Sequence, residues 1–182
     1  MFKKFLDQLY NIYEIIFTNI SFFSFLYLKF HESSVKKEIK MAEISKSDKI
    51  LHIGCGAIPY SLIIISNEIN AEIIGIDNQP RSIVLANKLL KRYKLSNKIQ
   101  IKEGSGETYN VSNFDLILIS YGVGNTEMIL KNVFNNLKKD GKILLRYSTI
   151  EKNDYIDSVI QKYSIKKIKL LLTQESILIV KN

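Results

Sequence analysis

The stretch "KILHIGCGAIPYSLIII", residues 49–65, decides the fold, because turn-forming residues interrupt an otherwise continuous apolar run. Gly54, Cys55 and Gly56 follow a short strand-like segment, and Pro59 comes three residues later. A glycine-rich turn between a strand and a helix lets a ligand approach the backbone, and its free N–H groups lie at the positive end of the helix dipole. Proline is tolerated in the first turn of a helix, where its missing N–H needs no partner. The stretch therefore predicts a strand, a binding loop and a helix that begins near Pro59.

The chain after residue 49 alternates between short Ile- and Leu-rich runs and segments with the length or periodicity of helices. Such alternation is typical of a parallel sheet covered on both faces. The last two runs are separated by only a few residues, which predicts an antiparallel hairpin. We predict an α/β fold: a doubly wound, Rossmann-like, mostly parallel seven-stranded sheet that ends in an antiparallel hairpin. The predicted strands are 49–54, 71–77, 99–104, 114–120, 142–148, 164–172 and 175–180.

The residues before this alternation form a short helical extension. Residues 2–20 place apolar side chains three or four positions apart, which predicts a helix with one apolar face. Further helices are expected after Ser21 and over residues 35–44, and a polar turn precedes the first strand. We therefore divide the chain into an N-terminal helical extension, residues 1–46, and a Rossmann-like domain, residues 47–182.

The composition excludes several classes of protein. With 182 residues, of which 46% are hydrophobic and 24% charged, the chain is typical of a folded globular protein. The uncharged stretch 15–28 is shorter than the roughly 20 residues of a membrane-spanning helix, so no membrane span is predicted. One cysteine, Cys55, and two histidines exclude an internal disulfide and are too few for a zinc cluster. We expect a cytoplasmic protein without a metal site.

A net charge of +8 raises the question of a nucleic-acid partner. Apolar residues at helical spacing run through the most basic stretch, which places the bases on the outer face of an amphipathic helix. A solvated helix face explains the cluster, and nucleic-acid binding is kept as an alternative. The cluster consists of Lys88, Lys91, Arg92, Lys94, Lys98 and Lys102.

An acidic residue and the order of the elements indicate which cofactor is bound. Asp77 ends the second predicted strand, 21 residues after Gly56, where a carboxylate can reach the hydroxyl groups of a ribose. A dinucleotide fingerprint would place a third glycine at Pro59, which argues against NAD. The strand order, the closing hairpin and the loops resemble class I S-adenosylmethionine-dependent methyltransferases over residues 49–181. The resemblance implies S-adenosylmethionine as cofactor and a small molecule as substrate.

The same resemblance assigns roles along the carboxyl edge of the sheet. In that family the first loop holds the methionine part, which implies this role for Gly54 and Gly56. The acid after the second strand, here Asp77, would bind the ribose. Residues 104–106 would frame the adenine, although the family often has an aspartate at Ser105. With their neighbours, the implied cofactor-binding residues are Gly54, Cys55, Gly56, Asp77, Asn78, Gly104, Ser105, Gly106 and Ser120.

A narrower resemblance concerns three stretches. "IGCGAIPYS", "GIDNQPRSIVLANKL" and "GKILLRYS" are similar to parts of nicotianamine synthases and their relatives, which share a Gly-x-Gly-x-x-Pro loop and a Leu-Leu-x-Arg strand. Those enzymes transfer the 3-amino-3-carboxypropyl group of S-adenosylmethionine to an amine. The helical extension of this chain is much shorter than their N-terminal domain. The resemblance implies a role for Glu32, which lies about where that family has a functional glutamate.

Three residues are predicted to be catalytic. Tyr121, after the fourth strand, and Arg146, near the end of the fifth, lie where open α/β sheets bind ligands. Arg146 either holds a substrate carboxylate through two hydrogen bonds or forms an ion pair within the fold. Glu32 either accepts a proton from the acceptor or is a solvated helix charge. His52 is interpreted as a hydrogen-bonded core residue, and Cys55 as a small residue that fills the turn.

Several functions are compatible with these residues, because a fold alone does not fix chemistry. Methyl transfer to a small molecule is the first hypothesis, and aminocarboxypropyl transfer to an amine is the second. A non-catalytic module that binds S-adenosylmethionine is a third hypothesis. The fourth is RNA methylation, suggested by the basic stretch 88–102.

Overall fold

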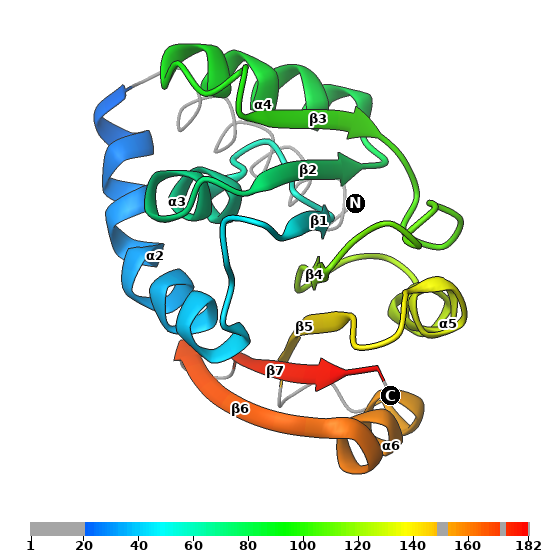
Figure 1. Ribbon diagram of the computed structural model, residues 1–182. Helices are drawn as coiled ribbons and strands as arrows, with labels where there is room; N and C mark the ends of the chain where they lie inside the picture. The colour runs from blue at the N-terminus through cyan, green and yellow to red at the C-terminus, as the bar shows by residue number, and fades with distance from the viewer. Residues whose placement is uncertain (1–20, 149–152, 172–173, 182) are drawn as a thin grey trace, which may run out of the picture.

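The structure, a computed structural model, describes residues 21–148, 153–171 and 174–181. The helix predicted over residues 2–20 lies outside this part of the chain. The described strands form one seven-stranded sheet with the order β3-β2-β1-β4-β5-β7-β6 (Figure 1). The strands are β1 (Lys49–Ile53), β2 (Glu72–Asp77), β3 (Ile99–Glu103), β4 (Leu116–Ile119), β5 (Lys142–Ser148), β6 (Ser164–Leu171) and β7 (Gln174–Val180).

The sheet confirms the predicted fold class. Strands β1 to β5 pair in parallel, whereas β7 is antiparallel to both β5 and β6. From β1 the sheet grows first through β2 and β3 and then, on the other side, through β4 and β5. The carboxyl ends of β1 and β4 therefore border the crevice in which open α/β sheets bind ligands.

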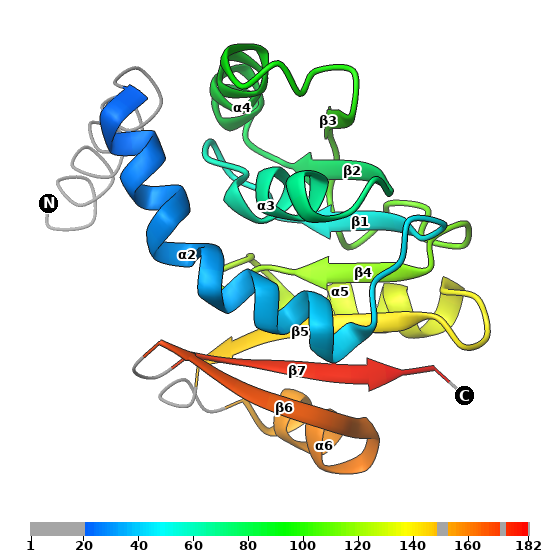
Figure 2. The ribbon, with the colours of Figure 1, turned by 60° about the vertical axis from the view of Figure 1, so that its left-hand side comes forward.

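Helices cover both faces of the sheet. Helices α2, α3 and α4 contribute to the apolar core on one face, and α5 and α6 contribute to the core on the other (Figure 1). Figure 2 shows α2 running obliquely across its face beside α3. The helices are α2 (Ser21–Ala42), α3 (Tyr60–Glu68), α4 (Pro80–Arg92), α5 (Thr126–Asn136) and α6 (Asp154–Tyr163).

Helix α3 forms against the local preference of its sequence. Its residues 61–66 are rich in isoleucine, which favours strands, and all six are buried. The segment must connect the parallel strands β1 and β2, however, and such a crossover is usually helical. The helix begins at Tyr60, directly after Pro59, as the sequence predicts.

Helix α2 differs from the prediction, because the two helices expected on either side of residue 34 form one continuous helix of 22 residues. No glycine or proline interrupts residues 21–42. Glu32 forms ion pairs with Lys29 at 2.8 Å and with Lys36 at 3.0 Å, which link successive turns. These features explain why the helix continues past residue 34, where the sequence predicted a boundary.

The two halves of α2 have different surroundings. Phe22, Phe25 and Phe30 in the first half are exposed, whereas Val35 and Met41 in the second half are buried in the core. None of the helices in the described residues combines the length and hydropathy that a membrane span requires.

Candidate functional site

The loop after β1 is shaped by its two glycines. Gly54 and Gly56 have φ angles of +72° and +66°, in the left-handed region that favours glycine. A Cβ atom on Gly54 would also lie 2.4 Å from Cγ1 of Val123, so the position excludes a side chain for steric reasons. The N–H groups of Gly54 and Cys55 donate to the carbonyl of Ile76, at 2.9 and 3.0 Å. The loop is thus anchored to β2 and leaves an open cradle above Gly56.

Asp77, at the end of β2, faces this loop. Its Oδ2 accepts a hydrogen bond from the N–H of Gly56 at 2.9 Å, and its Oδ1 accepts one from the N–H of Gln79 at 2.9 Å. Each carboxylate oxygen has a further lone pair, so Asp77 can hold the loop and still accept hydroxyl donors. The arrangement fits a ribose at this position.

A groove of about 440 Å³ runs along the carboxyl ends of β1, β2 and β3. Its volume and its polar lining, which includes the carboxylates of Asp77 and Glu107, fit a nucleoside cofactor. Cys55 and Ser120 line a neighbouring cavity instead. The other seven predicted cofactor-binding residues line the groove: Gly54, Gly56, Asp77, Asn78, Gly104, Ser105 and Gly106.

The far wall of this groove is held by contacts that the sequence did not indicate. The N–H of Gly104 donates to the carbonyl of Asp77 at 3.0 Å. From α5, the side-chain amide of Asn132 donates to the carbonyls of Gly106 at 2.9 Å and Tyr109 at 3.0 Å. Asn132 was missed because a polar residue on an amphipathic helix carries no signal until its partners are known.

Arg146, on β5, is buried, and its guanidinium group donates hydrogen bonds to other residues of the fold. Its Nε and Nη2 donate to the two carboxylate oxygens of Glu38, at 2.9 and 2.6 Å. Nη1 donates to the hydroxyl of Tyr60 at 2.8 Å, and Nη2 also donates to Oγ of Ser61 at 2.8 Å. The edge that would hold a substrate carboxylate is therefore occupied. This corrects the first of the two expected roles of Arg146 and leaves the ion pair.

The structure separates Glu32 from the other predicted catalytic residues. Glu32 pairs with Lys29 and Lys36 on the outer surface of α2, and the hydrogen bond from Lys29 lowers the pKa of its carboxyl group. The glutamate that reaches the sheet is Glu38, which is 1% exposed. Six residues of helix correspond to about 600°, so the two side chains point to different sides of α2. Glu32 is thus a surface charge.

Tyr121 lies where three hollows meet. It directly follows Ser120 at the end of β4 and is 40% exposed. It lines the groove of about 440 Å³, a cavity of about 210 Å³ beside α2, and a hollow of about 400 Å³ towards α6. Of the predicted catalytic residues, Tyr121 and Arg146 come together at the smaller cavity.

Two histidines line the cavity of about 210 Å³. Nε2 of His52 lies 2.7 Å from Oγ of Ser120, whereas Nδ1 is buried without a hydrogen-bond partner in the described residues. Burial, with the nearby charge of Arg146, lowers the pKa of His52 well below its usual value. Burial also lowers the pKa of His31 to about 4. His52 is thus the core residue that we expected, but only one of its nitrogens is paired.

Cys55 is buried in the turn between the two glycines. Burial raises the pKa of its thiol to about 12, and the charge of Asp77 acts in the same direction. The thiol is therefore neutral at physiological pH, which fits a residue that fills the turn and does not fit a nucleophile.

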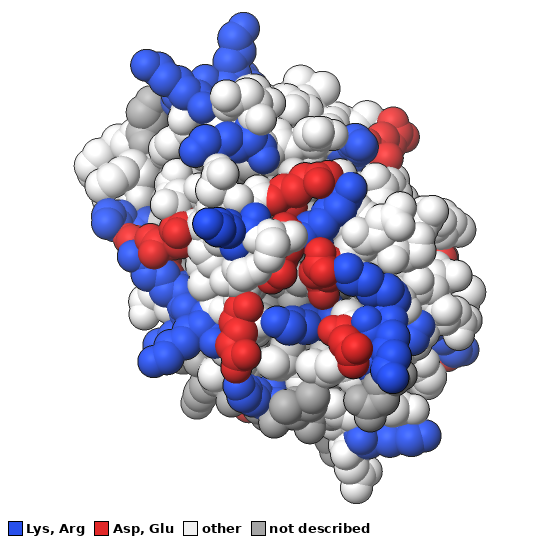
Figure 3. Space-filling view, in the orientation of Figure 1, with Lys and Arg blue, Asp and Glu red and all other residues white. Residues whose placement is uncertain are grey.

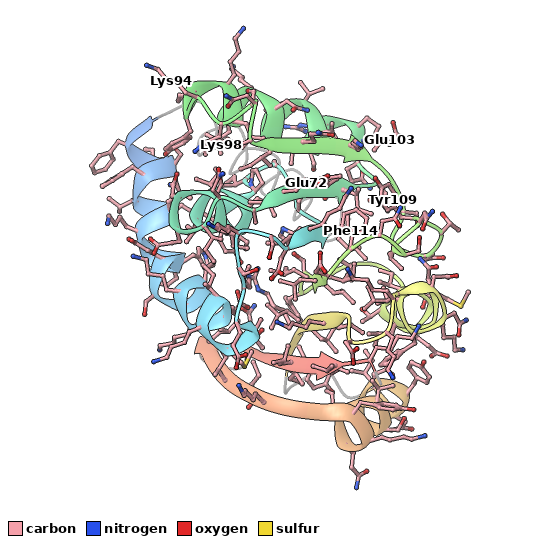
Figure 4. All side chains as sticks on the ribbon, viewed as in Figure 1. Glu72, Lys94, Lys98, Glu103, Tyr109 and Phe114 are labelled. Carbon is pink, nitrogen blue, oxygen red and sulfur yellow. The ribbon has the colours of Figure 1, made fainter. Side chains whose placement is uncertain are left out.

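Part of the basic cluster, including Lys94 and Lys98, lies away from the groove, whereas Lys102 is close to the carboxyl end of β3. Figure 3 shows Lys and Arg side chains over α4, while basic and acidic side chains are mixed across the middle of this face. Lys98 directly precedes β3, so it lies at the amino edge of the sheet. In Figure 4, Lys94 and Lys98 lie at one end of β3, and Glu103 and Tyr109 lie at the other.

Residues 44–176 match the model of a family described as a methyltransferase domain. Among curated proteins, the chain is 28% identical over 115 residues to a demethylmenaquinone methyltransferase of Lactobacillus johnsonii. It is 24% identical over 121 residues to an L-histidine 2-aminobutanoyltransferase of Yersinia pestis. These matches cover 59% and 66% of this chain but only 47% and 45% of the two relatives, so the chain spans about half of their length.

The fold is shared with solved structures. The chain superposes on MtNAS, a nicotianamine synthase solved with MTA and tNA, with a TM-score of 0.72 and 15% sequence identity. The superposition covers 87% of this chain and 62% of that protein. At this identity the likeness concerns the fold.

Proposed function

Because the chain belongs to the methyltransferase domain family, we propose that it is an S-adenosylmethionine-dependent transferase that methylates a small molecule. The observation that carries this proposal is the groove itself, in which the loop of Gly54 and Gly56 faces the carboxylate of Asp77. A buried thiol in Cys55, with no second cysteine in the sequence, suits the cytoplasm as the site of this activity.

Each wall of the groove has a part in holding the cofactor. The loop of Gly54 and Gly56, with open space above Gly56, packs against the methionine part, and Asp77 holds the ribose hydroxyls. The loop 104–106, fixed by Asn132, frames the adenine through backbone groups. The groove belongs to residues 47–182, which we propose as the cofactor-binding domain, with residues 1–46 as a helical extension.

The proposed transfer depends more on positioning the acceptor and the cofactor than on activating the cofactor chemically. Bound S-adenosylmethionine supplies a methyl carbon on a sulfonium, and the sulfur leaves readily. The protein therefore has to align the acceptor with that carbon and exclude water. Tyr121, at the junction of the groove and the two adjoining hollows, is the residue placed to contact both partners.

The role of Asp77 predicts a measurable loss of cofactor affinity. We expect Asp77→Ala to weaken binding of S-adenosylhomocysteine about 10- to 100-fold in isothermal titration calorimetry, because two ribose hydroxyls lose a charged acceptor. Glu72→Ala is the matched control, since Glu72 lies at the opposite end of the same strand and is exposed. Equal affinities for the two variants would refute the ribose assignment.

Aminocarboxypropyl transfer is the second candidate. It is favoured by the loop from Gly54 to Pro59, which has the Gly-x-Gly-x-x-Pro pattern, and by the name of the relative from Yersinia pestis. The two reactions release different nucleosides. We would incubate the protein with S-adenosylmethionine and a metabolite extract and analyse the products by mass spectrometry.

The product decides between the candidates. S-adenosylhomocysteine would support methyl transfer, and methylthioadenosine above the enzyme-free background would support the second candidate. Tight binding of S-adenosylhomocysteine without either product would support a non-catalytic binding module.

A further inference from the structure

The first half of helix α2 exposes an apolar surface. Phe22, Leu26 and Phe30 follow one another at intervals of four residues, so they lie along one side of the helix. The opposite side packs into the core through Leu28. A helix that is apolar on both sides is normally buried, so its exposed side needs a partner. Four large apolar side chains of this half are between 51% and 64% exposed: Phe22, Phe25, Leu26 and Phe30.

The second half of α2 is basic on the same outer side. At about 100° per residue, Lys37 and Lys40 lie within about 60° of the direction of Phe22 around the helix axis. Figure 3 shows basic side chains over the later turns of α2, at the left of this face. Four exposed lysines line one open hollow of about 500 Å³ on this surface: Lys29, Lys36, Lys37 and Lys40.

Acidic side chains offset only part of this charge. Glu32 pairs with Lys29 and Lys36, and Lys36 also pairs with Glu68 of α3 at 3.0 Å. Lys37 and Lys40 form no ion pair within the part of the chain that the structure describes. The outer side of α2 thus has an apolar first half and a positively charged second half.

This combination is complementary to the surface of a bilayer that contains anionic lipids. Phenylalanine and leucine side chains enter the boundary between headgroups and acyl chains, and lysines lie beside the phosphate groups. A helix that lies on a membrane needs neither the length nor the hydropathy of a spanning helix. The sequence before the apolar half is uncharged back to Ile15, so no acidic residue adjoins it to repel such lipids.

A second copy of the chain is less complementary to this surface. If two copies of α2 packed in parallel about a two-fold axis, the lysines of one would face the lysines of the other, and like charges repel. If they packed antiparallel, the apolar half of each would cover the basic half of the other. The lysines would then lose hydration without gaining a counter-ion.

We propose that the outer side of α2 binds the surface of a bilayer that contains anionic lipids. Phe22, Leu26 and Phe30 enter the boundary of the acyl chains, and Lys37 and Lys40 bind the headgroup phosphates. Membrane binding goes beyond the proposed function and does not depend on it.

The other side of α2 gives this binding a consequence for the site. Tyr27 and His31 line the cavity of about 210 Å³ beside the cofactor groove. A helix with its side chains is about 10 Å across, so a membrane bound to the outer side lies close to this cavity.

Tryptophan fluorescence tests the proposal, because the sequence contains no tryptophan. Phe30→Trp places a reporter on the apolar surface, and Met128→Trp places one at an exposed position of α5, on the other face of the sheet. We expect vesicles of phosphatidylcholine and phosphatidylglycerol to shift the emission of Phe30→Trp to shorter wavelengths, and bromine-labelled lipids to quench it. The emission of Met128→Trp should respond to neither.

Flotation with the same vesicles measures the affinity of the wild type and two double variants. Phe22→Ser with Leu26→Ser should weaken binding by about tenfold or more, because fewer apolar side chains leave water. Lys37→Ala with Lys40→Ala should weaken it about 10- to 30-fold at low salt, and added salt should reduce this difference. All four side chains are exposed, so the urea unfolding midpoints should match that of the wild type.

The contrary results each have a meaning. Wild-type protein that does not float with the mixed vesicles, or floats equally with phosphatidylcholine alone, would overturn the proposal whatever the variants do. Equal shifts in Phe30→Trp and Met128→Trp would show that α2 is not the binding surface. A shift that grows with protein concentration without vesicles would assign the surface to a second copy. Short-wavelength emission at every concentration, unchanged by vesicles, would assign it to residues 1–20 of the same chain.

The two proposals fail separately. Vesicle binding is measured without nucleoside, and binding of S-adenosylhomocysteine is measured without vesicles. A protein that floats as described but does not bind the nucleoside would contradict the proposed function alone. A protein that binds the nucleoside but not the vesicles would contradict membrane binding alone.

Discussion

At the scale of single residues, burial changes the chemistry of His31, His52 and Cys55 from what their types suggest. The pKa of His31 is lowered to about 4 and that of His52 is lowered well below the usual value, mainly because burial disfavours the charged imidazolium. The pKa of Cys55 is raised to about 12 for the corresponding reason, since burial disfavours the thiolate. These side chains act as neutral groups in a cavity whose charges are already balanced.

The lowered pKa of His31 predicts a loss of stability in mild acid. Between its folded value of about 4 and the unfolded value of 6.5, the unfolded chain binds more protons, so the free energy of unfolding decreases as the pH falls through this window. Above pH 6.5 the effect vanishes. After allowance for partial exposure, we expect a decrease of about 1 kcal/mol between pH 7 and pH 5.

Urea denaturation at the two pH values measures this difference, and His31→Gln provides the comparison. The variant should show a smaller decrease, because the remaining dependence comes from His52 and from carboxyl groups. An identical decrease in both proteins would show that His31 titrates normally in the folded state.

At the scale of elements, helix α2 contributes residues to the site although it precedes the first strand of the sheet. Its Glu38 pairs with Arg146 of β5, and its Tyr27 and His31 line the cavity of about 210 Å³. The side chain of Lys142, also on β5, donates to the carbonyl of Ala42 at 2.7 Å, so the end of α2 is held as well. The position of Tyr27 and His31 at this cavity therefore depends on the ion pair and the hydrogen bond between α2 and β5.

The buried ion pair predicts that Glu38 and Glu32 differ sharply in their effect on stability, although both lie on α2. Glu38→Gln leaves the charge of Arg146 buried without its counter-ion, and we expect a loss of about 3 kcal/mol in the free energy of unfolding. Glu32→Gln should leave the unfolding midpoint unchanged, because its partners are exposed lysines.

Chemical denaturation followed by circular dichroism compares these two variants with the wild type. Product formation by the transferase should fall in Glu38→Gln and persist in Glu32→Gln. The reverse order would restore Glu32 as the functional glutamate implied by the nicotianamine synthase resemblance.

At the scale of the whole molecule, the two edges of the sheet are specialised differently. The carboxyl edge carries the groove and the adjoining cavities, whereas Lys98 precedes β3 and Lys91 lies in the last turn of α4, at the amino edge. Lys91 and Lys98, two of the bases that suggested a nucleic-acid partner, thus lie away from the proposed reaction.

This separation predicts that the basic cluster is dispensable for transfer to a small molecule. We expect the double variant Lys91→Ala, Lys98→Ala to bind S-adenosylhomocysteine and form product within about twofold of the wild type, since neither lysine lines the groove. If the substrate were RNA, activity would fall steeply in this variant and with added salt.

The sequence by itself determined the alternation of strands and helices, the glycine loop and the acid at Asp77, because each depends on local periodicity or on a short spacing. It also located Tyr121 correctly at the carboxyl edge, since the end of a strand can be read from an apolar run. Only the tertiary structure decided which glutamate meets Arg146. That choice depends on the rotation and placement of α2 against a strand more than 100 residues away, and one sequence holds no periodic signal for such a contact. The cavity of about 210 Å³ could not be predicted for the same reason, because residues of α2, α3, β1, β5 and β7 line it only after the chain has folded.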